Sequence, residues 1–149
     1  MLPKPSYMDL AFAEARAAGA AHEVPVGCAI VRGDEVIARA GNRTLRDRDP
    51  TAHAEMVAIR QAAAALGSER LTDCDLYVTL EPCAMCAAAI SFARIRRLYY
   101  GAADPKSGAV ENGVRFYASP TCHHRPEVYG GINESECGEL LKSFFQARR

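Results

Sequence analysis

Four side chains in two short segments of the sequence can together bind a metal ion and move a proton. His53 and Glu55 stand two positions apart, and Cys83 and Cys86 follow about thirty residues later, directly after a proline. One imidazole and two thiolates give a zinc ion three protein ligands and leave a fourth position for water. An open position of this kind is typical of a catalytic zinc site, whereas structural sites are closed by a fourth protein ligand.

Glu55 lies next to the predicted ligands, where a general acid and base is needed. Zinc lowers the pKa of a bound water, and Glu55 can accept the proton that this water loses. The resulting hydroxide can attack an electrophilic ring carbon that carries an amine, and Glu55 can return protons to the ring nitrogen and to the departing ammonia. The pattern H-x-E followed by P-C-x-x-C is the signature of zinc-dependent nucleobase deaminases.

The spacing of these residues constrains the elements that carry them. Side chains two apart on a helix point in nearly opposite directions, so His53 and Glu55 serve one site only if it faces the end of their helix. Cys83 and Cys86 are three apart and share a helix face. We therefore expect zinc to lie between two helix N-termini, whose partial positive charge favours thiolates.

The remaining periodicity predicts helices and strands in alternation. We expect helices over residues 6–21, 51–66 and 83–92 and a last helix from Asn133, and strands over residues 24–31, 35–40, 76–80, 97–101 and 127–131. Met56, Ile59, Ala63 and Leu66 should form one face of the second helix, and Cys137, Leu140, Leu141 and Phe144 the inward face of the last one. Ser6 with Asp9, and Asn133 with Glu136, are predicted helix caps. Residues 104–126 are rich in Gly and Pro and are the least predictable.

This order of elements predicts one domain over residues 1–149, with an α/β fold of three layers, α/β/α, around a central mixed β-sheet. The chain has 49% hydrophobic and 24% charged residues, as is typical of a soluble globular domain. No apolar run approaches the ~20 residues of a membrane span, and the N-terminus lacks an apolar core like that of a signal peptide. We therefore expect a cytoplasmic protein with no membrane contact.

The six cysteines need a separate interpretation, because nothing in the sequence indicates secretion. Cys28 and Cys74 adjoin apolar runs and are expected to be buried thiols. Cys122 lies beside His123 and His124, so a second metal site and a plain loop are both compatible with this segment. The formal net charge is +0, and the clustered arginines on their own are more typical of solvated faces than of a nucleic-acid site.

Beyond the zinc motif, the chain resembles the cytidine deaminase-like superfamily and, within it, the bacterial tRNA-specific adenosine deaminases. The resemblance is carried by residues 23–27, 41–43, 49–56, 76–86, 100–102, 104–109 and 144–149. The zinc motif is common to the superfamily, whereas the flanking segments and the basic tail narrow the resemblance to the tRNA enzymes. Residues 114–125 depart from that pattern, with His123 where an asparagine is expected.

This resemblance implies a homodimer with one Zn²⁺ per subunit that converts adenosine to inosine at the wobble position of a tRNA anticodon, in an arginine tRNA. It implies that Asn42 hydrogen-bonds the target base and that Asp104 and Lys106 touch neighbouring nucleotides. It also implies contacts to the anticodon stem-loop from the last helix, made by Phe145, Arg148 and Arg149. An anticodon loop already has splayed bases, so flipping one of them costs less than in a duplex.

Each implied contact has a simpler structural alternative. Asn42 can be a turn residue, Asp104 and Lys106 an exposed loop pair, and Phe145 a core residue. Arg148 and Arg149 can form a solvated tail.

Three other functions are alternatives to a tRNA adenosine deaminase. A small-molecule deaminase acting on guanine, cytosine, cytidine or another free nucleoside would share the zinc site but need no basic surface. A catalytically silent RNA-binding subunit would be expected to lack Glu55. A purely structural zinc domain would usually carry a fourth Cys or His, and none follows Cys86 at a suitable spacing.

Overall fold

The computed structural model describes residues 6–148, so Arg149 and most of the N-terminal stretch discussed above lie outside the described residues. Within this range the chain forms one mixed sheet of strand order β2-β1-β3-β4-β5. The strands are β1 (Gly27–Arg32), β2 (Glu35–Gly41), β3 (Cys74–Leu80), β4 (Arg97–Ala102) and β5 (Glu127–Tyr129). β1 pairs antiparallel with β2 and β3, whereas β3–β4 and β4–β5 are parallel. A parallel pair needs a long connection, which a helix provides between β3 and β4 and residues 103–126 provide between β4 and β5.

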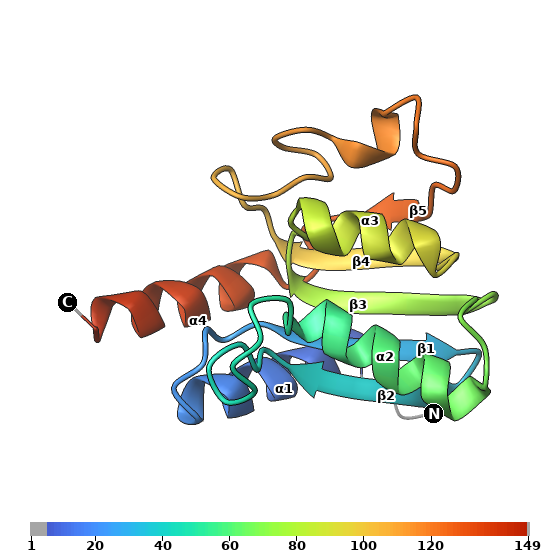
Figure 1. Cartoon of the computed structure of the whole chain (residues 1–149). Helices are drawn as coiled ribbons and strands as arrows, with labels where there is room; N and C mark the ends of the chain where they lie inside the picture. Colours follow the sequence, from blue (N-terminus) through green and yellow to red (C-terminus); the bar gives the residue numbers. More distant parts are fainter. Residues whose placement is uncertain (1–5, 149) are drawn as a thin grey trace, which may run out of the picture.

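Helices cover both faces of this sheet and complete the expected three layers (Figure 1). They are α1 (Tyr7–Ala20), α2 (Ala54–Leu66), α3 (Ala84–Phe92) and α4 (Glu134–Gln146). α2 and α3 lie together on one face, where Leu76 and Val78 of β3 point into the larger core cluster. Tyr77, between them, points to the opposite face and packs with Met8 of α1. The predicted α/β fold with a mixed sheet is therefore confirmed.

The inner face of α2 differs from the prediction. Its fully buried stripe consists of Ala54, Ala58 and Ala62, whereas the predicted face of Met56, Ile59, Ala63 and Leu66 is only partly buried. Alanines let the helix axis approach the sheet closely, and the larger residues then pack at the margins of the contact. The prediction ranked residues by hydrophobicity, but here small size decides which face touches the sheet.

Of the two predicted helix caps, Ser6 is confirmed as the cap of α1, whereas the roles expected for Asp9 and Asn133 need correction. Ser6 caps α1 by accepting a hydrogen bond from the Met8 N–H at 3.2 Å, but the carboxylate of Asp9 is bonded elsewhere. Asn133 stands at the N-cap of α4 in a left-handed conformation with no side-chain cap bond. Its side-chain amide instead donates to Asp9 Oδ1 at 3.4 Å, so these two residues join α1 to α4.

Several boundaries shift by two or three residues from those predicted. β1 begins at Gly27 rather than at Val24, and α2 begins three residues later than expected because Asp49 Oδ1 accepts from the N–H and hydroxyl of Thr51, which holds a turn there. The least predictable segment runs over α3 and contains one short 3₁₀ turn, Phe116–Ala118 (Figure 1). Among residues 6–148, no helix has the length and apolar character needed to cross a bilayer.

Candidate active site

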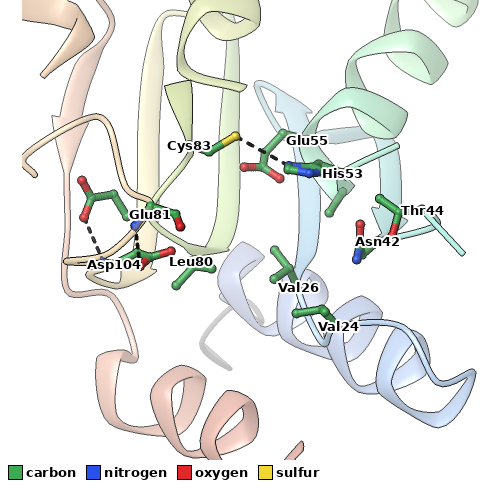
Figure 2. Close-up of a pocket in the computed structure, with 12 residues that line it drawn as sticks. Val24, Val26, Asn42, Thr44, His53, Glu55, Leu80, Glu81, Cys83 and Asp104 are labelled. Atoms are coloured by element: carbon green, nitrogen blue, oxygen red, sulfur yellow. Dashed lines mark hydrogen bonds between the residues drawn. The ribbon is translucent and has the colours of Figure 1, made fainter. Parts of the chain in front are cut away.

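Two helix N-termini meet at one end of the sheet. His53 is the N-cap residue of α2 and Cys83 is the N-cap residue of α3, and neither side chain caps its own helix. Both side chains point toward each other instead, as Figure 2 shows. His53 Nδ1 lies 3.6 Å from the Sγ atom of Cys83 and 3.6 Å from that of Cys86. The structure therefore brings the three predicted ligands together in the predicted position between two helix starts.

The distances among these atoms fit a zinc ion. The three ligand atoms lie within 4.8 Å of one another. In a tetrahedral site with Zn–S of about 2.3 Å and Zn–N of about 2.0 Å, nitrogen and sulfur lie about 3.5 Å apart. The observed 3.6 Å separations match this value. A hydrogen bond from the Cys86 thiol lowers the pKa of Cys83 to about 4, in the direction that favours the thiolate form to which zinc binds.

The second possible metal site is not formed. Among the described residues, His53, Cys83 and Cys86 are the one group of three or more such side chains close enough to share an ion. Cys122 is buried and its thiol donates to the carbonyl of His124 at 3.1 Å. His124 Nε2 pairs with the carbonyl of Ile95 at 2.7 Å, so this segment holds the chain against the end of α3.

Glu55 occupies the first turn of α2, beside the ligands, and is 4% exposed. Burial raises the pKa of its carboxyl to about 7. A group with a pKa near the working pH exchanges a proton in both directions at little cost, which is what a proton shuttle requires.

A cavity of about 290 Å³ opens in front of these groups. It is lined by Val24, Val26, Asn42, Thr44, His53, Ala54, Glu55, Leu80, Glu81, Cys83, Asp104 and Ser107. Figure 2 shows Asn42 and Thr44 on one side of it, Glu81 and Asp104 on the other, and His53, Glu55 and Cys83 between them. Its size suits a flat ring compound of the dimensions of a nucleobase.

Asn42 is the residue of the cavity whose hydrogen bonding is incomplete. It is 7% exposed, and its Oδ1 has no hydrogen-bond partner within the described residues. A buried acceptor without a donor costs free energy that a ligand carrying a donor restores. Asn42 thus combines an unpaired acceptor with a position in the lining of the cavity.

Of the other predicted contact residues that the structure describes, Asp104 alone lines this cavity. Its Oδ1 accepts from the N–H groups of Lys106 and Ser107 at 3.1 Å each. Lys106 is exposed and is not part of the lining. The Phe145 side chain is 52% exposed, so its interpretation as core filler is wrong. Arg148 is exposed, with its guanidinium carbon 3.5 Å from the centre of the Phe144 ring, and Arg149 lies outside the described residues.

Two glutamates with prominent roles were not singled out from the sequence. Glu23 is 0% exposed and accepts backbone N–H groups from Leu45 and Arg46. Glu81 is 2% exposed and also lines the cavity. One signal was available, since each acidic residue directly adjoins an apolar segment, and a charged residue there is rarely buried without dedicated partners.

Comparison with known proteins extends this description. The family model of the cytidine and deoxycytidylate deaminase zinc-binding region matches residues 3–102. The tRNA-specific adenosine deaminase of Agrobacterium fabrum is 62% identical over 149 residues, which cover 100% of this chain and 98% of that protein.

Solved structures give the same picture. One from studies of A-to-I editing by tRNA A34 deaminases at the wobble position superposes with a TM-score of 0.89 at 65% identity, covering 91% of this chain and 98% of that one. The guanine deaminase of Bacillus subtilis matches with a TM-score of 0.66 at 31% identity, covering 99% of this chain and 94% of its own. The fold is therefore shared with an enzyme that is named for a different substrate, guanine.

Proposed function

The chain belongs to the cytidine and deoxycytidylate deaminase family of zinc-binding proteins, and we propose that it converts adenosine to inosine at the wobble position of a tRNA anticodon. The observation that carries this proposal is the 62% identity to a tRNA-specific adenosine deaminase over the whole chain. The fold alone would not select this substrate, since the guanine deaminase of Bacillus subtilis shares it.

The reaction is a hydrolysis, in which water adds to C6 of adenine, the bond from C6 to the exocyclic nitrogen breaks, and ammonia leaves. His53, Cys83 and Cys86 hold the zinc ion, and the fit of their atoms to tetrahedral coordination supports this assignment. The zinc ion, when bound, supplies the Lewis acidity that activates water. Glu55 accepts a proton from the attacking water and delivers protons to N1 and to the leaving amine. Its burial and its pKa of about 7 support this role.

The base is recognised inside the cavity and the rest of the anticodon outside it. Asn42 pairs with a donor on the flipped nucleoside, as its unpaired Oδ1 suggests. Asp104, at the cavity wall, and exposed Lys106 contact the neighbouring nucleotides. Phe145 and Arg148 are exposed on and just after α4, and together with Arg149 they contact the stem-loop, for which an exposed aromatic ring and guanidinium groups are suited.

The same resemblance extends to the setting in which the enzyme works. An arginine tRNA is the proposed substrate, and a cytoplasmic homodimer the proposed form. An interface in this dimer would cover exposed apolar side chains such as Phe92, which is 74% exposed, and Val114, which is 70% exposed. Light scattering should give twice the 16.1 kDa of one chain. A monomeric mass at micromolar concentration would contradict the dimer.

Guanine deamination is the second candidate, favoured by the 31% identity and full-length match to the Bacillus subtilis enzyme. It would use the same zinc site but would gain nothing from Lys106, Phe145 or the basic C-terminus. Salt dependence separates the two, since binding of an anticodon stem-loop weakens steeply with added salt whereas binding of a neutral base hardly changes.

The deciding experiment offers the purified, zinc-loaded protein an anticodon stem-loop with adenosine at the wobble position. Free adenosine, cytidine and guanine are tested in parallel, and a stem-loop with guanosine at the wobble position is the matched control. We expect inosine from the adenosine stem-loop only. Xanthine from guanine, or uridine from cytidine, with an unreacted stem-loop would contradict the proposal and favour a small-molecule deaminase.

A further inference from the structure

Glu81 directly follows β3 and precedes α3, and its carboxylate accepts hydrogen bonds from four backbone N–H groups and one side-chain amide. Oε1 accepts from the N–H of Asp104 at 3.0 Å and from the side-chain amide of Asn112 at 2.6 Å. Oε2 accepts from the N–H groups of Val110, Glu111 and Asn112 at 3.1, 2.9 and 3.0 Å. All five donors belong to the loop of residues 104–112, which follows β4.

This 104–112 loop forms the side of the cavity that faces Asn42. Asp104 and Ser107 line the cavity, and Figure 2 shows Asp104 joined to Glu81 on the side opposite Asn42 and Thr44. Within the loop, Asp104 Oδ1 accepts from the Ser107 N–H, so the position of Ser107 depends on that of Asp104.

Glu81 differs from Glu55 in that hydrogen-bond donors of the protein already occupy its carboxylate. The two oxygens of a carboxylate offer about four lone-pair sites in total, and five N–H donors already share them in Glu81. No position is left for a water or a reacting nitrogen, so Glu81 takes no part in proton transfer. It acts on the loop alone.

Gly108 provides a second, independent sign that the loop is built around this carboxylate. A Cβ atom at Gly108 would lie 2.5 Å from the carboxyl carbon of Glu81 and 2.5 Å from the carbonyl oxygen of Asp104. Real Cβ atoms essentially never approach other atoms so closely, so the loop backbone and the carboxylate are in direct contact there. Any side chain at this position would push the loop away from Glu81.

We propose that Glu81 is a positioning residue for the substrate, which fixes the 104–112 loop as one wall of the cavity and so determines how tightly the anticodon nucleotides are held. This inference rests on the proposed function. The loop meets the substrate through Asp104 and Ser107, whereas the predicted zinc ligands and Glu55 lie on other elements. Loss of Glu81 should therefore weaken substrate binding much more than it slows the chemical step.

The test compares zinc-loaded Glu81→Gln with Glu127→Gln, a matched exposed control whose carboxylate pairs only at the surface, with Arg97 and Tyr129. Since hydrogen bonds to a charged group contribute substantially more than neutral ones, we expect KM for the stem-loop to rise roughly tenfold or more in Glu81→Gln. The change in kcat should stay below about threefold. Zinc content should remain one ion per chain in both variants. A fall in kcat at unchanged KM would overturn the proposal.

Hydrogen exchange gives a second readout that needs no substrate. In Glu81→Gln the amides of residues 104 and 110–112 should lose protection, whereas those of α2 and α3 should keep theirs. Unchanged protection in the loop, or loss of protection throughout the molecule, would overturn the positioning role. If the wild-type protein failed to form inosine, the proposed function would fall while the exchange result would still decide whether Glu81 holds the loop.

Two glycine variants test the same loop without changing the Glu81 carboxylate, in case Glu81→Gln folds poorly. Gly108→Ala should reproduce the rise in KM, because the added methyl group displaces the same loop. Gly138→Ala is the matched control, since a Cβ there meets nothing within 4 Å. Equal KM values in the two alanine variants would contradict the proposal.

Discussion

Two buried glutamates stand behind opposite sides of the cavity and hold their loops in different ways. Glu23 organises residues 42–49, accepting N–H groups from Leu45 at 3.1 Å and Arg46 at 2.9 Å, and it also pairs with the Arg46 guanidinium at 3.1 Å. Glu81 organises residues 104–112 through five N–H groups, and among residues 6–148 no Lys or Arg pairs with it.

The difference determines what each glutamate controls. Arg46 also donates to the carbonyl of Asn42 at 2.9 Å, so Glu23 reaches the base-recognition residue through a neighbouring side chain. Glu81 acts directly on the backbone of its loop. The Glu23 side can therefore be altered at the charged side chain of Arg46, whereas four of the five donors to Glu81 are backbone N–H groups and the fifth is the neutral side-chain amide of Asn112. The following predictions test this contrast, from the largest expected effect to the smallest.

Glu55→Gln should have the largest effect on catalysis, because Glu55 transfers the protons in the reaction that both loops support. We expect kcat to fall by about 10³-fold or more while zinc and stem-loop binding persist, since general acid–base catalysis typically contributes 10²–10⁴-fold. Single-turnover deamination with zinc analysis measures this. Near wild-type turnover by Glu55→Gln would refute the role of Glu55 in proton transfer.

Arg46→Gln tests whether Glu23 depends on its cation. The change leaves a buried carboxylate with fewer donors, and we expect the free energy of unfolding to fall by roughly 1–3 kcal/mol. KM for the stem-loop should rise, because the carbonyl of Asn42 loses its donor. Denaturant titration and steady-state kinetics give the two values.

The double variant Glu23→Gln/Arg46→Gln is the control for this change. It should recover part of the lost stability, because no charge is left unpaired. If Arg46→Gln were as stable as the wild type, Glu23 would be held by N–H groups alone, and the contrast with Glu81 would disappear.

The stabilisation that Glu23 contributes to the folded protein should be lost as the pH falls. Burial would raise the pKa of Glu23, but N–H groups of Arg46 and Leu45 and the Arg46 charge outweigh it and lower the pKa. Because the folded-state pKa lies below the unfolded one, the stabilisation is present above about pH 4.3 and is lost as pH falls through the folded value. Between about pH 5 and pH 3, Glu23→Gln should therefore lose less stability than the wild type. Equal slopes would contradict the assignment.

Phe145→Ala should produce the smallest effect on stability, because the side chain belongs to neither loop and is 52% exposed. We expect less than about 0.5 kcal/mol of change in the free energy of unfolding, as is usual for surface positions. Stem-loop affinity should nevertheless fall severalfold if the ring stacks on RNA. A loss of stability above that range would mean that its edge-to-face contact with Phe144 is structural.

The sequence predicts the chemical centre better than the walls around it. His53, Cys83 and Cys86 are recognisable because metal ligation dictates both residue type and spacing, and helix geometry then places them at two N-termini. Apart from the Arg46 guanidinium and the Asn112 side-chain amide, the partners of Glu23 and Glu81 are backbone N–H groups 22 to 31 residues away, which any amino acid except proline supplies. Residue identity therefore carries no signal for these contacts, and only the folded chain reveals them.

The alanine stripe of α2 and the crossing of Asn133 to Asp9 escaped prediction for a related reason. Both depend on the distance between elements that are remote in sequence, which periodicity within one helix does not encode. The mixed sheet, by contrast, follows from the alternation of elements, because a hairpin gives an antiparallel pair and a helix between two strands favours a parallel one.

The side chains of His53 and Cys83 leave α2 and α3 without side-chain caps, since both turn toward the metal position. A cation bound there ties the first turns of two helices to each other and fixes the side chains that would otherwise be free to move. Binding free energy is then also folding free energy for this end of the domain. Loss of zinc therefore costs stability at this end of the domain as well as activity.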